Sequence, residues 1–286
     1  MPIDVIETSR GCPFNCKFCS ITNMYGHSFR AFPEDRIVED LRRIRALGAK
    51  AVFLADDNIT CAPDHFRMVC RAIVKHSLNG MVYVVQASAA GLASNPDIVE
   101  EMDKANFRVV FVGFESMIQT NLRDMQKPTN PAVNRATAEL LHKHNMGIIA
   151  GIIVGYPDDT RETIAENMRL FRELKPDALY AQYLTPYPKT RLRDEMLAAG
   201  LVVNKDDFSQ YDGFTCNVRT RHMTSDELFR ALKQEAIMYA LDPGHLVHNY
   251  FLKRYPCAVI RAAILTVYSD LFNILTGRRY ARKTDV

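Results

Sequence analysis

The sequence predicts an α/β fold made of repeated βα units, followed by a run of helices. Short apolar runs rich in β-branched residues alternate with longer segments whose apolar residues recur at helical spacing, a pattern typical of parallel strands joined by helices. The chain has 286 residues, 48% of them hydrophobic, which is enough for one substantial core. Such units form either an open doubly wound sheet or a curved barrel, and periodicity does not separate the two.

Six segments are expected to be strands because each is short and largely apolar. They are residues 3–8, 51–55, 82–87, 108–114, 147–154 and 178–185. Between them, apolar residues line one face of each predicted helix, as in the sets Ile37, Leu41, Ile44, Leu47 and Ile164, Met168, Phe171, Leu174. Helix starts are marked by capping residues or an early proline near residues 33–34, 94–96 and 159–162. In either topology the carboxyl ends of the strands carry the site.

Beyond about Leu201 the alternation stops, and helical patterns follow at residues 224–240, 243–254 and 257–275. We therefore expect residues 1–200 to form the βα domain and residues 201–286 to form a connecting region with a C-terminal helical cap. The last helical segment is apolar, but Arg261 and Asp270 interrupt it within a span-length window. Packing against the βα domain is therefore expected rather than a membrane span.

Charge and composition indicate the class of partner and the cellular compartment that we expect for the protein. The 36 basic and 33 acidic residues nearly balance, so no nucleic-acid partner is predicted. The first residues lack the pattern of a secretory signal, so we expect a cytoplasmic protein. The basic end formed by Arg278, Arg279, Arg282 and Lys283 also offers a peripheral contact with a membrane surface. In the cytoplasm, the seven cysteines are metal ligands or inert thiols rather than a disulfide framework.

Three cysteines follow the first predicted strand at C-x3-C-x2-C spacing: Cys12, Cys16 and Cys19. Three converging thiolates suit a soft metal site, and a [4Fe–4S] cluster held by three cysteines leaves one iron to which a small molecule can bind. Structural zinc is the alternative, with His27 as the candidate fourth ligand. The spacing lacks the paired C-x2-C arrangement usual for such zinc sites.

This loop resembles that of the radical S-adenosylmethionine superfamily, because Cys12, Cys16, Phe18 and Cys19 reproduce its C-x3-C-x-aromatic-C motif after the first strand. The resemblance covers approximately residues 3–200 and implies a partial (β/α)6 TIM-type barrel with a C-terminal helical extension. It implies that the three cysteines hold a [4Fe–4S] cluster and that Phe18 packs against the adenine of S-adenosylmethionine. It also implies reductive cleavage of that cofactor to a 5′-deoxyadenosyl radical, with a reducing protein such as flavodoxin or ferredoxin as partner.

The resemblance assigns further cofactor contacts to polar residues after the second and third strands. Ala55-Asp56-Asp57-Asn58 places Asp57 and Asn58 where the family binds the amino group of the cofactor, although the family often has Gly-Gly-Glu there. A turn that caps a helix is the alternative reading of this segment. Gln86 and Ser88 end the third strand, so they are expected at the same edge of the sheet, where the carboxyl ends of the strands meet.

The fourth and fifth strands supply the remaining candidates. Gly113-Phe114-Glu115-Ser116 resembles the Gly-x-Glu-Ser strand end of the family, so Glu115 is expected to accept hydrogen bonds from the ribose, with Ser116 nearby. A surface salt bridge is the alternative for Glu115. Gly155 resembles the glycine beside adenine, where it permits close approach, and a simple strand-ending glycine is the alternative.

The other thiols have no assigned function. Cys70 and Cys257 lie in apolar helical patterns and are expected to be inert. Cys61 and Cys216 are candidates for a redox or hydrogen-atom-donor function, with an inert thiol as the default because reactive thiols need special surroundings. No auxiliary cluster is predicted.

The strand ends Ala-Asp-Asp-Asn and Gly-Phe-Glu-Ser most resemble the branch of the superfamily whose members often carry an N-terminal cobalamin-binding domain. The cluster strand begins almost at Met1, so we expect a cobalamin-independent enzyme, a piece of a longer enzyme, or one half of a split system with a separate cobalamin-binding subunit. The branch includes methyltransferases and enzymes that remodel tetrapyrroles, lipids or natural products, so methyltransferase and oxidoreductase both stay open as the reaction subclass. The expected function is C–H activation of an unidentified small molecule, and a noncatalytic zinc- or cluster-binding scaffold is the alternative.

Overall fold

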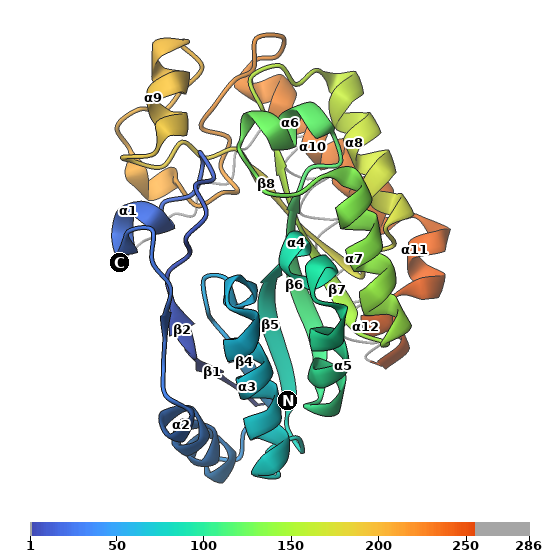
Figure 1. The fold of residues 1–286 in the computed structure, drawn as a ribbon. Coiled ribbons are helices and arrows are strands. Elements are labelled where there is room, and N and C mark those ends of the chain that lie inside the picture. Colours follow the sequence, from blue (N-terminus) through green and yellow to red (C-terminus); the bar gives the residue numbers. More distant parts are fainter. Residues whose placement is uncertain (1, 255–286) are drawn as a thin grey trace. The chain divides into compact units, whose positions relative to one another are not determined.

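The computed structural model, drawn in Figure 1, describes residues 2–254. These residues divide into two compact units. The first unit comprises the chain up to Cys16, then Ile21–Phe114 and Gln126–Ala150. The second comprises Lys17–Ser20, Glu115–Met125 and, of the residues described, 151–254. The chain therefore passes between the units inside the cysteine loop, with Cys12 and Cys16 in the first and Cys19 in the second. The predicted domain boundary near Leu201 stays a prediction.

All six predicted strands are present, with ends that differ from the prediction by at most two residues. They are β1 (Ile3–Ile6), β4 (Ala51–Leu54), β5 (Val82–Ser88), β6 (Phe107–Glu115), β7 (Gly147–Val154) and β8 (Ala178–Tyr183). They are hydrogen-bonded in exactly their chain order, and the pairs β1–β4, β4–β5 and β5–β6 are parallel. A doubly wound sheet reverses its strand order at a switch point, whereas a barrel adds each strand beside the last. The strand order therefore confirms the partial (β/α)6 barrel type.

In the first unit, helices form a layer along the strands (Figure 1). Neighbouring members contact one another in the pairs α2–α3, α3–α5 and α5–α7, as right-handed crossovers in one direction require. The helices of this unit are α1 (Ile21–Tyr25), α2 (Glu34–Ala46), η1 (Ile59–Cys61), α3 (Pro63–Lys75), α4 (Ala89–Ser94), α5 (Pro96–Lys104) and α7 (Pro131–Lys143). The predicted face of α2 is buried except at Leu47, which is 82% exposed because the helix ends at Ala46.

The second unit contains the later helices. They are α6 (Gln119–Asp124), α8 (Arg161–Glu173), α9 (Arg191–Ala198), η2 (Phe208–Gln210), α10 (Ser225–Ala240), α11 (Pro243–His248) and α12 (Tyr250–Arg254). Helix α8 begins with a capping box formed by Thr160 and Thr163, and its predicted apolar face is buried. Helix α10 packs against α8, and the side chains of Arg172 and Glu235 form an ion pair of 2.9 Å between them.

The single helix predicted over residues 243–254 is wrong, because the chain leaves the helical conformation at Asn249. The Asn249 side chain donates a hydrogen bond to the Asp177 carbonyl at 2.6 Å, and the Tyr250 amide donates to the Asp177 carboxylate at 2.5 Å. These contacts with a residue 72 or 73 positions away replace the helical pattern. The predicted helix at residues 257–275, with Cys257, and the basic end lie outside the described residues. No helix within residues 2–254 is long and apolar enough to cross a membrane.

Two short strands that the sequence did not predict enclose the cysteine loop. Strand β2 (Ser9–Arg10) pairs antiparallel with β3 (Arg30–Ala31), and Phe32 donates a backbone hydrogen bond to the Thr8 carbonyl at 2.9 Å. The two ends of the loop segment are thereby held side by side. Strand β1 consequently ends at Ile6 rather than at Thr8.

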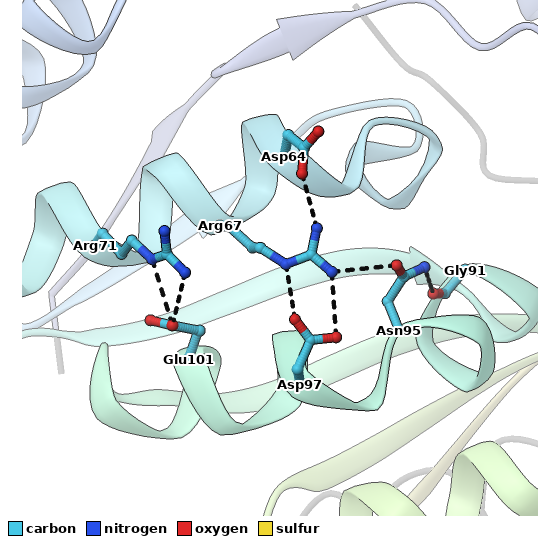
Figure 2. Close-up of polar contacts among 7 residues, drawn as sticks. All are labelled: Asp64, Arg67, Arg71, Gly91, Asn95, Asp97 and Glu101. Carbon is cyan, nitrogen blue, oxygen red and sulfur yellow. Dashed lines mark hydrogen bonds and ion pairs between the residues drawn. The ribbon is translucent and has the colours of Figure 1, made fainter.

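Helices α3 and α5 are joined by surface ion pairs (Figure 2). Arg67 lies 2.8 Å from the Asp97 carboxylate and 2.9 Å from that of Asp64, while Arg71 lies 3.2 Å from Glu101. Phe66 of α3 is fully buried and meets Phe107 of β6 edge to face at a ring distance of 5.6 Å. The buried contact of Phe66 with β6 therefore contributes more to the stability of α3 in the fold than the exposed charges that join α3 to α5.

We predict that Phe66→Ala lowers the free energy of unfolding by about 3–5 kcal/mol, because it removes a buried ring and leaves a cavity. The adjacent substitution Arg67→Ala removes ion pairs to the exposed carboxylates of Asp64 and Asp97 and a hydrogen bond of 3.3 Å to Asn95 Oδ1, and it should have a much smaller effect. Urea unfolding of both variants beside the unsubstituted chain measures the difference. An Arg67→Ala loss as large as that of Phe66→Ala would contradict the prediction.

Candidate active site

A buried carboxylate fixes the chain where it enters the cysteine loop. Asp56, which follows β4, is fully buried and accepts hydrogen bonds from the Thr8 amide at 2.7 Å, the Thr8 hydroxyl at 2.6 Å and the Ser9 amide at 2.6 Å. The Nε2 atom of His65 lies 3.2 Å from the Thr8 hydroxyl oxygen. Burial raises the pKa of Asp56, and the hydrogen bonds from Thr8 and Ser9 oppose that effect. Sequence reasoning placed Asp56 among the polar residues after β4 but missed this anchoring contact.

The first turn of the loop requires a glycine. Gly11 has φ +92°, and a Cβ atom there would lie 2.3 Å from the Ser28 carbonyl oxygen. The Gly11 amide donates to Asp57 Oδ2 at 2.7 Å. Asp57, predicted to bind the cofactor, therefore also holds the backbone immediately before Cys12.

Hydrogen-bond donors surround the Cys12 sulfur. The Asn58 side-chain amide lies 3.8 Å from Cys12 Sγ, and Cys61 Sγ lies 3.7 Å from it. The contact with Cys61 and the hydrogen bonds from the Phe14 backbone and Asn58 lower the pKa of Cys12 to about 6, against the opposing effect of burial. The same contact with Cys12 raises the pKa of Cys61. The thiolate, the form that ligates metals, is therefore favoured at Cys12.

A threonine links the ends of β4 and β5. The Thr60 hydroxyl lies 2.6 Å from Asn58 Oδ1 and 2.8 Å from the Ser88 hydroxyl, and it accepts from the Ser88 amide at 3.1 Å. Ser88 also caps α4 through the Gly91 amide. Gln86 is half-buried on β5 and pairs in register with Phe111 of β6. Asn58 and Ser88 are thus brought into one network, and Thr60, which sequence reasoning missed, connects them.

The second half of the cysteine loop is held by backbone contacts within the second unit. The Lys17 amide donates to the Met125 carbonyl at 3.0 Å, and the Leu192 amide donates to the Lys17 carbonyl at 3.2 Å. The Lys17 ammonium group also lies 2.9 Å from the Glu195 carboxylate. These contacts fix the segment that carries Phe18 and Cys19, both of which are half-buried.

Glu115 and Ser116 occupy a tight turn at the end of β6. Glu115 is half-buried and has φ +64°, a left-handed conformation that residues other than glycine adopt rarely. The Ser116 hydroxyl accepts from the Ile118 amide at 3.0 Å and lies 3.3 Å from Asn167 Oδ1. Asn167 Oδ1 also accepts from the Met117 amide at 2.7 Å. Ser116 and Asn167 therefore stabilise the turn that presents Glu115.

Packing explains why residue 155 is a glycine. It has φ +93°, and a Cβ atom there would lie 2.9 Å from Leu228 Cδ2 of α10. The amides of Gly155 and Tyr156 both donate to Asp159 Oδ2 at 2.9 Å. The close approach that this glycine permits is therefore to α10, and its contact with adenine stays a prediction.

The chemistry of the donor set suits an iron–sulfur cluster. Cys12, Cys16 and Cys19 are all half-buried thiols, and the surroundings of Cys12 favour the thiolate. Within residues 2–254, no three His, Cys, Asp or Glu side chains are gathered closely enough to hold a metal ion. The Nδ1 atom of His27, the candidate fourth zinc ligand, lies 3.4 Å from the Pro13 carbonyl oxygen.

The chain belongs to the Radical SAM superfamily, whose family model matches residues 6–171, more than half of the chain. It is 27% identical over 263 residues to an uncharacterized methyltransferase from Pyrococcus horikoshii, covering 89% of this chain and 56% of the relative. It is 28% identical to the hopanoid C-2 methylase of Rhodopseudomonas palustris, covering 90% of this chain and 50% of the relative. The chain thus spans about half the length of these curated relatives.

A solved structure confirms the fold class. The radical S-adenosylmethionine methyltransferase TsrM from Kitasatospora setae, with cobalamin and a [4Fe–4S] cluster bound, matches with a TM-score of 0.63 and 17% identity, covering 69% of this chain and 37% of that chain. At this identity the likeness concerns the fold alone. Membership of the superfamily implies a [4Fe–4S] cluster and S-adenosylmethionine as cofactors, as expected from the cysteine motif.

We predict that Asp56→Asn changes the pH dependence of stability in a defined direction. The raised pKa of Asp56 means that the folded chain holds this proton more tightly than the unfolded chain does. Its contribution is therefore fully present below the ordinary pKa of about 4 and is lost as the pH rises through the raised pKa. The stability advantage of the unsubstituted chain over Asp56→Asn should shrink over that interval, by about 1.4 kcal/mol per pH unit between the two pKa values.

Urea unfolding of the cluster-free chain and of Asp56→Asn at a series of pH values from 3.5 to 8 measures this difference. Comparing the two proteins cancels the titration of every group that they share. Parallel stability curves, or an advantage that grows as the pH rises, would show that burial does not dominate the titration of Asp56.

Proposed function

We propose that this chain holds a [4Fe–4S] cluster on Cys12, Cys16 and Cys19 and activates a C–H bond of a small-molecule substrate. When bound, the cluster supplies the electron that cleaves S-adenosylmethionine to methionine and a 5′-deoxyadenosyl radical. The observation that carries the proposal is the C-x3-C-x2-C loop directly after β1, in a chain that belongs to the superfamily. The lowered pKa of Cys12 supports it, because cluster ligation requires thiolates.

The chain's own polar residues bind and orient the cofactor in this proposal. Asp57 Oδ2 is engaged by the Gly11 amide, while Oδ1 has no hydrogen-bond partner within residues 2–254 and is suited to accept from the ammonium group. Asn58 lies beside the Cys12 sulfur. Gln86 and Ser88, at the carboxyl end of β5, are the other residues of the first unit that we assign to the cofactor.

In the second unit, we assign the ribose hydroxyls to Glu115, and Ser116 maintains the turn that presents it. Phe18 and Gly155 are assigned to the adenine. The resemblance of Gly113-Phe114-Glu115-Ser116 to the Gly-x-Glu-Ser strand end of the family supports the assignment of Glu115.

Methyl transfer is the second candidate reaction, favoured by the names of two relatives, a methyltransferase and a hopanoid methylase. The TsrM structure contains cobalamin, which we propose as the methyl carrier for this reaction. In this chain the carrier would come from a further domain or a separate cobalamin-binding subunit. The electron donor is proposed to be a flavodoxin or ferredoxin, and residues 201–286 are proposed to cap the barrel and govern substrate access.

We predict that replacing Cys12, Cys16 or Cys19 by alanine prevents stable cluster assembly, because two protein anchors remain on the cubane. Anaerobic reconstitution followed by iron, sulfide and zinc analysis measures the cluster, and 5′-deoxyadenosine formed with dithionite measures cleavage of the cofactor. Cys70→Ala is the matched control, since Cys70 is a buried thiol of α3. Stoichiometric zinc without iron in the unsubstituted chain would favour the scaffold alternative instead.

We predict that Glu115→Gln weakens S-adenosylmethionine binding by about 1–3 kcal/mol, because the amide keeps the shape of the side chain but loses a charged acceptor. Titration of the reconstituted chain with the cofactor measures the affinity, and thermal unfolding tests whether the fold is unchanged. Glu166→Gln on the exposed face of α8 is the matched control. An affinity equal to that of the control would remove Glu115 from the binding site.

A further inference from the structure

We propose that Cys12 and Cys61 form a reversible disulfide in the cluster-free chain, and that this disulfide excludes the cluster. The inference rests on the proposed function only through Cys12 as a cluster ligand. Cys61, which no assigned function uses, lies with its Sγ atom 3.7 Å from Cys12 Sγ. A sulfur–sulfur bond is about 2.05 Å long, so the two atoms need to approach by less than 2 Å.

The two thiols are held by separate, well-anchored elements of the first unit. Cys12 follows β2 and Gly11, whose amide is bound to Asp57. Cys61 ends η1, where its amide donates to the Asn58 carbonyl at 3.2 Å and the Thr60 side chain is bonded to Asn58 and Ser88. Their proximity therefore follows from the parallel pairing of β1 with β4, 49 positions apart in the chain, rather than from a flexible loop.

The exposure of the two thiols and the contact between them favour formation of the disulfide. Both thiols are half-buried, in contrast to Cys70 and Cys216, which are buried. A small oxidant can therefore reach either sulfur of the pair, whereas a thiol enclosed in the core is protected. Cys61 already lies in contact with Cys12, so it is placed to resolve an oxidised Cys12 before a second oxidant molecule arrives.

The step balances with a low-molecular-weight disulfide such as oxidised glutathione. The two protein thiols are oxidised to one Sγ–Sγ bond through a mixed disulfide, while the sulfur–sulfur bond of the oxidant breaks. The two thiol protons pass to the two molecules of reduced glutathione that leave. Thiol reduction reverses the step, whereas sulfinic and sulfonic acids do not return to thiols in this way.

The disulfide and the cluster compete for the same sulfur. A Cys12 sulfur bonded to Cys61 has no charge to offer an iron ion, so two ligand cysteines remain. Conversely, a Cys12 thiolate bound to iron is unavailable to Cys61. The oxidation state of this pair therefore decides whether the chain accepts a cluster, and the disulfide protects the ligand sulfur while no cluster is present.

Peptide mapping tests the pair directly. The cluster-free, reduced full chain is treated with oxidised glutathione, alkylated and digested with trypsin. The proposal expects peptide Gly11–Lys17 linked to Ala51–Arg67, with fragment ions that place the link on Cys12 rather than Cys16. A link through Cys16 or Cys19, or no intramolecular link to Cys61, overturns it.

Iron uptake tests whether the Cys12–Cys61 disulfide excludes the cluster. The oxidised chain should take up about tenfold less iron than the reduced chain, and dithiothreitol should restore uptake. Cys61→Ser should take up iron equally with and without prior oxidation, whereas Cys19→Ser should form the Cys12–Cys61 link but assemble no stable cluster. Equal uptake by oxidised and reduced chain with the disulfide present overturns the exclusion. If even the reduced chain takes up no iron, the proposed function fails, and the peptide map alone decides whether the pair forms.

Discussion

The hydrogen bonds that Asp56 accepts from Thr8 and Ser9 are the contacts on which the conformation of the cysteine loop depends. Burying a carboxylate is costly unless several donors compensate, and here two amides and one hydroxyl offset part of that cost. All three donors come from the two residues that lead into the loop. The cost of desolvation is therefore offset only when the chain leaves β1 in one direction, which places Gly11 and Cys12 beside the end of β4.

The surroundings of Cys12 combine two opposing properties. Neighbouring donors favour the thiolate that a metal needs, and the largest of these contributions comes from the Cys61 thiol. The same short sulfur–sulfur distance makes that neighbour a partner for oxidation. The Cys12 thiol can therefore either ligate iron or form a disulfide with Cys61. When the cluster is bound, Cys12 is a ligand and the disulfide cannot form.

Features that repeat within a short stretch of sequence were predicted well. The six strands and the cap at Thr160 depend on neighbours a few residues apart, so the sequence displays them directly. The break at Asn249 was not predictable, because its cause is Asp177, a partner 72 positions away. The Thr60 bridge between Asn58 and Ser88 was missed for the same reason, since it joins the ends of two strands.

The sequence by itself determined the alternation of strands and helices, the cysteine spacing and, through them, the superfamily. These properties arise from local periodicity and from ligand spacing along one loop. Only the tertiary structure decided that Asp56 anchors the loop, that Gly155 makes room for Leu228, and that Cys61 lies against Cys12. Each of these contacts joins residues that strand pairing or helix packing brings together, and the separation of such residues along the chain carries no signal of their distance in space.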